Sequence, residues 1–223
     1  MRIINKLATI FLLLIVSTFL YAGGQYYIKD YQITRSQYIF KKLYINTGES
    51  LYCGTPIPFP STETLTAEHV YAADWIASHF ECSNRITCKH PDYKRAEADL
   101  HNLWPELGRI NSSRSNLIFN EIDDSLNAHR FKELCDDFER TSASGGNTAY
   151  VEPRDSVKGN IARSLFYMHV EYGLPLKSMK PMLKRWNTLD PPNKHEYWRN
   201  ERIHQLQQIR NQFIDDHHLV DSL

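Results

Sequence analysis

The sequence predicts an α+β fold, a mainly helical single domain with a small β component, and two observations support this class. Apolar residues recur at helical spacing over a long segment, residues 155–172. By contrast, the stretches that suit strands, residues 65–72 and 117–122, are short. Once residues 1–22 are set aside, residues 23–223 are enough for one domain with a sizeable core.

Residues 1–22 have the pattern of an export signal. Arg2 and Lys6 precede an apolar run from Leu7 to Leu20, and a small residue follows it. A membrane anchor is the alternative, but hydroxyl residues interrupt the run, which is too short to span a bilayer comfortably. We therefore expect cleavage before Gly23, a periplasmic or secreted protein, and no lasting association with the membrane.

Helices are expected at three places in the mature chain. The first covers residues 31–44. The second, over residues 155–172, has apolar residues on one face and ends before Gly173. The third, over residues 194–213, likewise has apolar residues on one face with charged residues between them.

Strands are expected within residues 65–72 and 117–122, and the two segments could form a small sheet. Two other segments are rich in residues that break regular structure. Residues 53–64 contain three prolines, and residues 141–147 contain two adjacent glycines. Both are predicted to be loops within the single domain.

The four cysteines, Cys53, Cys82, Cys88 and Cys135, all lie in the mature part of the chain. An even number of cysteines in an exported protein favours disulfides over free thiols. Three pairings are open: Cys82 and Cys88 are close enough to close a small loop, whereas Cys53 and Cys135 would join distant segments. A Cys/His metal site is the alternative, although the chain has no C-x-x-C pair.

The charge of the chain is balanced, with 26 basic and 26 acidic residues. Removing the signal leaves a slightly negative mature protein. Bulk charge therefore gives no support for nucleic-acid binding, but a protein that binds phosphates needs only a local basic groove.

The adjacent pair Glu68 and His69 offers a carboxylate and an imidazole at one point on the chain. A carboxylate suits a hard cation such as Mg²⁺, and a neutral histidine can deprotonate a water molecule. Because neighbours on a strand point to opposite faces, both can serve one phosphate only where the strand ends or bends. By itself the dipeptide also fits an ordinary surface pair.

Two further clusters carry polar side chains. Residues 99–117 include Asn102, Asn111 and Asn116, whose amide oxygens suit a hard metal but equally suit turns. Residues 152–163 include Arg154 and Arg163, and arginine donates two hydrogen bonds to a phosphate. The alternative for residues 152–163 is a capped, solvated first turn of the helix expected at residues 155–172.

In their order along the chain, these clusters resemble the endonuclease I family of periplasmic and secreted bacterial nucleases. The resemblance runs from about Leu51 to Phe213. Several motifs in one order are more specific than any single motif. The matching segments are Tyr52-Cys53-Gly54, Glu68-His69-Val70, Ala98 to Leu103, Gly108 to Leu117, Cys135 to Glu139, Arg154 to Tyr167, Trp186-Asn187, and Glu201-Arg202-Ile203 with Asn211 and Phe213.

The resemblance implies a ββα-metal motif and cleavage of phosphodiester bonds in DNA, and often in RNA, with little sequence preference. His69 would be the general base, Glu68 and Asn116 would bind one Mg²⁺, and Arg85 would hold the scissile phosphate. Mn²⁺ and Ca²⁺ are the alternative cations. Products would carry 5′-phosphate and 3′-hydroxyl ends.

Further roles are expected for other residues. His101 and Asn102 would support and orient the site. Direct contacts with nucleic acid are expected from three arginines, Arg114, Arg154 and Arg163. The family pattern pairs Cys53 with Cys135 and Cys82 with Cys88. We expect a monomer.

The chain departs from the family in two places. Tyr71 and Ala72 stand where the family has valine and proline, and Gln208, Ile209 and Gln212 replace a glycine, an asparagine and a proline. The second set weakens the case for nucleic-acid contacts near the C-terminus. A catalytically weak or inactive nucleic-acid-binding module of the same fold is therefore the alternative function, and a metallohydrolase of another ester is a third.

Overall fold

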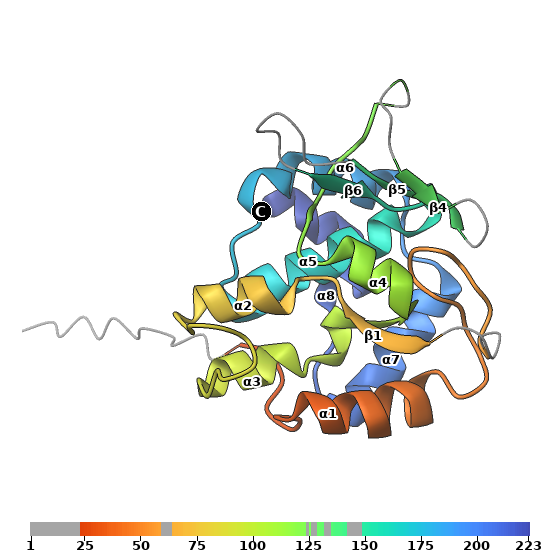
Figure 1. Ribbon diagram of the computed structural model, residues 1–223. Helices are drawn as coiled ribbons and strands as arrows, with labels where there is room; N and C mark the ends of the chain where they lie inside the picture. The colour runs from red at the N-terminus through yellow and green to blue at the C-terminus, as the bar shows by residue number, and fades with distance from the viewer. Residues whose placement is uncertain (1–22, 59–63, 124, 126–128, 132–134, 142–148) are drawn as a thin grey trace, which may run out of the picture.

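Helices surround a two-stranded antiparallel sheet and a four-stranded mixed sheet in the computed structural model (Figure 1). The structure describes residues 23–58, 64–123, 125, 129–131, 135–141 and 149–223. The proposed signal, residues 1–22, and most of the loop at residues 141–147 lie outside the described residues. In chain order the elements are α1 (Tyr31–Ile33), η1 (Thr34–Leu43), β1 (Leu65–His69), α2 (Ala73–His79), α3 (Pro91–Glu97), η2 (Leu100–Asn102), β2 (Leu103–Leu107), α4 (Gly108–Arg114), β3 (Ile118–Phe119), β4 (His129–Phe131), β5 (Cys135–Arg140), β6 (Tyr150–Glu152), η3 (Asp155–Val157), α5 (Lys158–Tyr172), η4 (Lys177–Met179), α6 (Lys180–Leu189), α7 (Lys194–Gln207), α8 (Gln212–Asp215) and η5 (His217–Ser222).

The predicted helix at residues 155–172 is confirmed as η3 followed by α5. It ends where Gly173 adopts a left-handed conformation with φ of 69°. The segment at residues 31–44 is also helical, but after one turn of α1 it continues as the π-helix η1. The side chain of Asp30 caps its start by accepting a hydrogen bond from the backbone N–H of Ile33.

The prediction of one continuous helix over residues 194–213 is wrong after Gln207. α7 ends at Gln207 because Gln208 takes a left-handed conformation, with φ of 60°. The side chain of Asn211 then accepts from the backbone N–H of Phe213 and starts the separate helix α8.

Both predicted strand segments contain strands, but the two do not belong to one sheet. β1 pairs antiparallel with β2, in a register that sets Leu65 opposite Leu107 and His69 opposite Leu103. β3 instead pairs parallel with β6 at the edge of a four-stranded sheet of order β3-β6-β5-β4. The sequence pattern identified the strands but not their partners.

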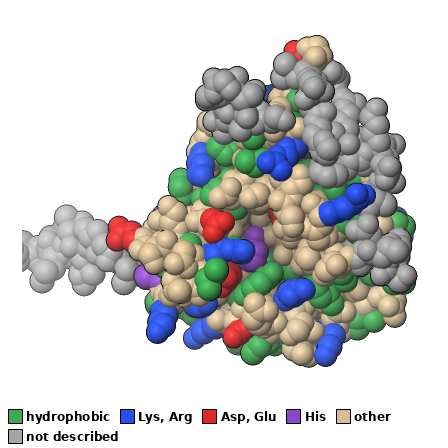
Figure 2. Space-filling view, viewed as in Figure 1, with side chains coloured by type: hydrophobic (Ala, Val, Ile, Leu, Met, Phe, Trp, Pro, Cys, Tyr) green, Lys and Arg blue, Asp and Glu red, His purple; other side chains and the backbone are tan. Residues whose placement is uncertain are grey.

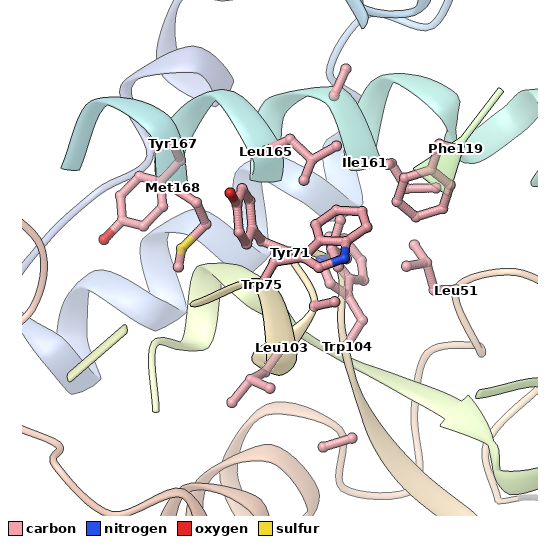
Figure 3. Packing of buried hydrophobic residues seen from close by; sticks show 14 of the residues in the cluster. Leu51, Tyr71, Trp75, Leu103, Trp104, Phe119, Ile161, Leu165, Tyr167 and Met168 are labelled. Atoms are coloured by element: carbon pink, nitrogen blue, oxygen red, sulfur yellow. The ribbon is translucent and has the colours of Figure 1, made fainter. Parts of the chain in front are cut away.

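Helix α4 begins at Gly108, directly after β2 ends, so β1, β2 and α4 form a ββα unit. Helix α5 crosses behind this unit, and buried side chains from both fill the space between them (Figures 1 and 3). Trp104 of β2 donates a hydrogen bond from Nε1 to Ser164 Oγ of α5 at 3.3 Å. The contact holds the ββα unit in a fixed position on the longest helix.

Two disulfides confirm the family pairing. Cys53–Cys135 joins the loop before β1 to the start of β5, 82 residues along the chain. Closing a loop of this length removes conformational entropy from the unfolded chain that is worth about 4 kcal/mol. Cys82–Cys88 closes the short loop between α2 and α3.

Within the described segments, no helix combines the length and the hydrophobicity needed to traverse a bilayer.

Candidate active site

Glu68 and His69 reach one cavity at the end of β1. His69 is the last residue of the strand and the backbone bends at Val70, as the sequence argument required. Both side chains are buried, with 2% of Glu68 and 8% of His69 exposed. The cavity has a volume of about 230 Å³ and is lined by residues of β1, α2, α4 and the Cys82–Cys88 loop. Figure 2 shows a histidine in a hollow on this face, with basic and acidic side chains near it.

The His69 ring is held with a defined proton position. Its Nε2 lies 2.9 Å from the carbonyl oxygen of Glu97, and a carbonyl can only accept, so Nε2 carries the hydrogen. Nδ1 is then the basic nitrogen. Burial lowers the pKa of His69 to about 4, with Arg85 and Arg114 adding to the effect. The imidazole is therefore neutral at pH 7 and able to accept a proton.

Aromatic packing restrains the same ring. The ring centroid of Tyr31 lies 4.7 Å from that of His69, and the Tyr31 hydroxyl donates to the carbonyl of Ala67 at 3.3 Å. Sequence analysis missed this residue because Tyr31 lies 38 positions before His69 and belongs to no motif.

The Glu68 carboxylate has two partners at one of its oxygens. The Tyr52 hydroxyl donates to Oε1 at 2.7 Å, and Arg114 Nη1 lies 3.2 Å from the same atom. Burial raises the pKa of Glu68 to about 7, while Arg114 and Tyr52 act in the opposite direction. Both of these contacts fall on Oε1, and neither involves Oε2.

Arg114 serves the interior of the site. Its side chain is only 1% exposed, and its guanidinium donates to the carbonyls of His69 at 2.9 Å and Val70 at 2.6 Å. It therefore fixes the bend that follows β1. Arg114 also lines the cavity, and its expected contact with nucleic acid stays a prediction.

Arg85 lies in the loop closed by Cys82–Cys88 and lines the same cavity as Glu68 and His69. Its Nε is 3.6 Å from Asp74 Oδ1, and both side chains are about half exposed, at 51% and 50%. An exposed pair at this distance contributes little energy, so a phosphate can replace Asp74 as the partner of the guanidinium. Asp74 was not singled out from the sequence.

Asn116 lies just past α4 and is exposed. The residue before it, Ser115, lines the cavity and has a positive φ of 53°. Asn111, which also lines the cavity, donates from Nδ2 to Thr66 Oγ1 at 3.1 Å and so ties α4 to β1. The ββα unit thus brings the segment carrying Asn116 to the edge of the cavity that contains Glu68.

The two expected ligands offer oxygens, the Glu68 carboxylate inside the cavity and the Asn116 amide next to the cavity residue Ser115, and oxygen ligands suit Mg²⁺. Within the described residues, no group of three or more His, Cys, Asp and Glu side chains is arranged to hold a metal ion. A cation held by Glu68 and Asn116 would therefore keep water in most of its coordination positions, which is usual for Mg²⁺. The chemistry of Glu68 and Asn116 is therefore compatible with a bound Mg²⁺ ion.

His101 and Asn102 differ in what they support. Asn102 accepts from the backbone N–H of Tyr71 at 2.6 Å and donates to its carbonyl at 3.0 Å, which fixes the segment after His69. His101 packs against Tyr167 and bonds through Nε2 to the carbonyl of Ile209 at 3.2 Å. Only Asn102 contacts the chain next to the cavity.

The two remaining arginines lie away from the cavity. Arg154 is largely buried, donates to the carbonyl of Leu51 at 3.2 Å and pairs with Glu49. Arg163 is fully enclosed and pairs with Glu196 through two hydrogen bonds. Burial leaves the guanidinium of Arg163 no surface for a phosphate in this conformation.

Comparison with known proteins agrees with this geometry. A family model described as Endonuclease I matches residues 17–218. An extracellular deoxyribonuclease of Aeromonas hydrophila is 28% identical over 199 residues, which cover 78% of this chain and 84% of that protein. Endonuclease-1 of Buchnera aphidicola subsp. Acyrthosiphon pisum is 31% identical over 156 residues, 67% of this chain and 59% of the relative.

A third relative, an extracellular ribonuclease of Bacillus subtilis, is 31% identical over 175 residues, 70% of this chain and 52% of that protein. The family match extends over most of the chain and includes the β1 segment with Glu68 and His69. The chain therefore belongs to the Endonuclease I family of nucleases, which are phosphodiester hydrolases.

Proposed function

We propose that this protein is an exported, Mg²⁺-dependent endonuclease that cleaves DNA and RNA with little sequence preference, leaving 5′-phosphate and 3′-hydroxyl ends. Relatives named as a deoxyribonuclease and as a ribonuclease support both substrates. The two disulfides and the relatives' extracellular names support a periplasmic or secreted location. Mn²⁺ and Ca²⁺ are the alternative cations.

The observation that carries the proposal is the fixed tautomer of His69 in a cavity shared with Glu68 and Arg85. A general base needs an unprotonated nitrogen in contact with the reacting water. The Glu97 carbonyl assigns the hydrogen to Nε2, and burial keeps the ring neutral, so Nδ1 has a lone pair for a proton.

The residues then have distinct tasks. His69 takes a proton from water at Nδ1 while the water oxygen bonds to phosphorus and the bond from phosphorus to the 3′ oxygen breaks. The departing oxygen takes a proton from solvent. Arg85 holds the phosphate oxygens with its two-pronged guanidinium. Tyr52 and Arg114 keep the Glu68 carboxylate in position.

Glu68 and Asn116 would hold the cation, which when bound supplies positive charge to the phosphate and to the departing oxygen. Asn116 is the less constrained of the two because it is exposed at the end of α4. Its role rests on its place next to Ser115 at the cavity edge.

A cleavage assay tests the proposal. Oxidised protein is incubated with plasmid DNA and with RNA in Mg²⁺, and cleavage is expected on both substrates. Addition of EDTA and the change His69→Ala should each remove it. His218→Ala is the matched control, because His218 is exposed and outside the cavity, and it should cleave normally.

The outcome that contradicts the proposed base is full activity of His69→Ala. The alternative function, a binding module, predicts salt-sensitive retention of nucleic acid in a gel with no new ends in any divalent cation. Ligation of the products by a DNA ligase checks the chemistry of the ends, because ligase requires a 5′-phosphate and a 3′-hydroxyl.

A further inference from the structure

A second, larger cavity lies between three segments that the proposed reaction does not use. Its volume is about 650 Å³, within the range of small-molecule sites. Residues 48–51, the start of α5 and the start of α7 line it. Among the described residues, none lines both this cavity and the one that contains Glu68 and His69.

Asn160 is the polar group at the inner wall of this cavity. It lies in the first turn of α5, is 5% exposed, and its Oδ1 has no hydrogen-bond partner among the described residues. The start of α5 is already capped, because Asp190 Oδ2 accepts from the backbone N–H of Gly159 at 2.9 Å. Asn160 is thus not needed as a cap, and a buried acceptor without a donor is costly.

Three apolar side chains form part of the same inner wall, together with the buried Ser50. Leu51, Trp104 and Val157 line the cavity and are each buried. Trp104 is held rigidly, because its Nε1 donates to Ser164 and the guanidinium of Arg199 lies 3.8 Å from its ring centroid. A flat organic group therefore fits better here than a branched or charged one.

The net charge at the rim of the cavity is positive, although burial lowers the pKa of His195 so that its ring is neutral near pH 7. Arg154, Lys194 and His195 line it together with one acid, Glu49, which is paired with Arg154. Lys194 is exposed and makes no ion pair with another described residue. An anionic group at the rim would gain a partner in the Lys194 ammonium.

We propose that this cavity binds a nucleoside 5′-monophosphate. The flat base lies against Leu51, Trp104 and Val157 and donates a ring or amino N–H to Asn160 Oδ1, while the phosphate meets Lys194 at the rim. Extensive phosphodiester hydrolysis releases molecules of this chemical class. The cavity would therefore be a product site outside the catalytic cavity, which the proposed function does not include.

Calorimetric titration of the whole oxidised protein with AMP in EDTA tests the site. EDTA removes divalent cations and so prevents binding through a cation at Glu68. We expect one AMP per protein, weaker binding of adenosine, which lacks the phosphate, and weaker binding of inorganic phosphate, which lacks the base. No binding of AMP would overturn the proposal whether or not the protein cleaves nucleic acid.

Two substitutions assign the binding to this cavity. Asn160→Leu has a similar shape and removes an unpaired acceptor, so the fold should be retained while AMP affinity falls about tenfold or more. Lys194→Glu should weaken AMP but leave adenosine unchanged. Lys41→Glu is the charge-matched control, because Lys41 is exposed on η1 and does not line the cavity, and its AMP affinity should be unchanged.

The catalytic cavity gives the opposing control. His69→Ala removes the proposed base but should bind AMP as the unmodified protein does. If Arg85→Ala loses AMP while Asn160→Leu keeps it, the nucleotide lies in the catalytic cavity and the proposed second site is wrong. Thermal unfolding of Asn160→Leu separates a lost contact from a lost fold.

Discussion

Two buried arginine–glutamate pairs in this protein have the same composition but different geometry. Arg163 of α5 and Glu196 of α7 are 0% and 1% exposed, and two hydrogen bonds occupy both carboxylate oxygens. Arg114 and Glu68 are 1% and 2% exposed, but their contact at 3.2 Å falls on Oε1 alone. We call the first the closed pair and the second the open pair.

The difference lies in what else the arginines bind. In the closed pair, the remaining donors of Arg163 reach Asn187 and the carbonyl of Asp190, so the guanidinium joins three segments of the fold. In the open pair, Arg114 holds the carbonyls of His69 and Val70. The closed pair links parts of the fold to one another. The open pair instead holds a carboxylate at a cavity, and the contacts of Tyr52 and Arg114 fall on only one of its two oxygens.

The largest expected effect comes from removing the charge of the open pair. Glu68→Gln should lower cleavage activity by at least about 100-fold, which is typical when a group that places charge at the reacting phosphate is lost. Stability at pH 7 should fall less than for the closed pair, because burial raises the pKa of Glu68 to about 7 and its carboxyl is partly protonated before the substitution. Initial rates on plasmid DNA and urea unfolding measure the two quantities, and near-normal rates would contradict the assignment of Glu68.

The closed pair should respond in the opposite way. Glu196→Gln leaves the charge of Arg163 buried without a counter-ion, which costs about 3–5 kcal/mol of unfolding free energy. The fraction that remains folded should cleave at the normal rate, because neither residue lines the catalytic cavity. Urea unfolding checks the first expectation. A specific rate that falls in a sample shown to be folded by circular dichroism would contradict the second.

The sequence could predict the open pair only in part. The ordered motifs identified Glu68 and His69, and the helical spacing identified α5, because both depend on residues close together in the chain. Arg114 and Arg163 were both expected at the nucleic acid, since a guanidinium suits phosphate and carboxylate alike. Their burial depends on partners 46 and 33 residues away, which no local pattern specifies.

Local sequence patterns also failed to specify which strands pair and where helices end. The strand segments at residues 65–72 and 117–122 were recognised from apolar runs, but their pairing with β2 and β6 is set by tertiary packing. The end of α7 at Gln207 could not be predicted either, because a left-handed glutamine has no strong sequence signal. The family resemblance pointed to Arg85 by its position three residues before Cys88, and this residue lies in the loop closed by the disulfide and lines the cavity, while its role stays a prediction.

A smaller effect is expected from Arg114→Lys, which keeps the charge of the open pair but loses the planar fork. One ammonium cannot hold the carbonyls of His69 and Val70 and the Glu68 carboxylate with the same geometry. We expect about a tenfold lower rate and a loss of about 1–3 kcal/mol in stability, from unsatisfied buried carbonyls. Arg185→Lys is a control, because its pair with Glu121 is exposed and the change should affect neither quantity.

The last expected effect needs no substitution and concerns how activity depends on Mg²⁺ and pH. Burial raises the pKa of Glu68 to about 7 in the protein without a cation, so the carboxyl holds its proton below that pH and ionises above it. A proton and a cation therefore compete for Glu68. Lowering the pH from 8 to 6 should raise the half-saturating Mg²⁺ concentration about tenfold, the ratio of ionised fractions at a pKa near 7.

His69 should not contribute to that change. Its pKa is lowered to about 4, so it is neutral at both pH values, and the rate at saturating Mg²⁺ should change much less than the half-saturating concentration. Rates measured over a range of Mg²⁺ at pH 6 and pH 8 separate the two quantities. An unchanged half-saturating concentration would show that Glu68 does not titrate in this range and would contradict the competition between a proton and a cation.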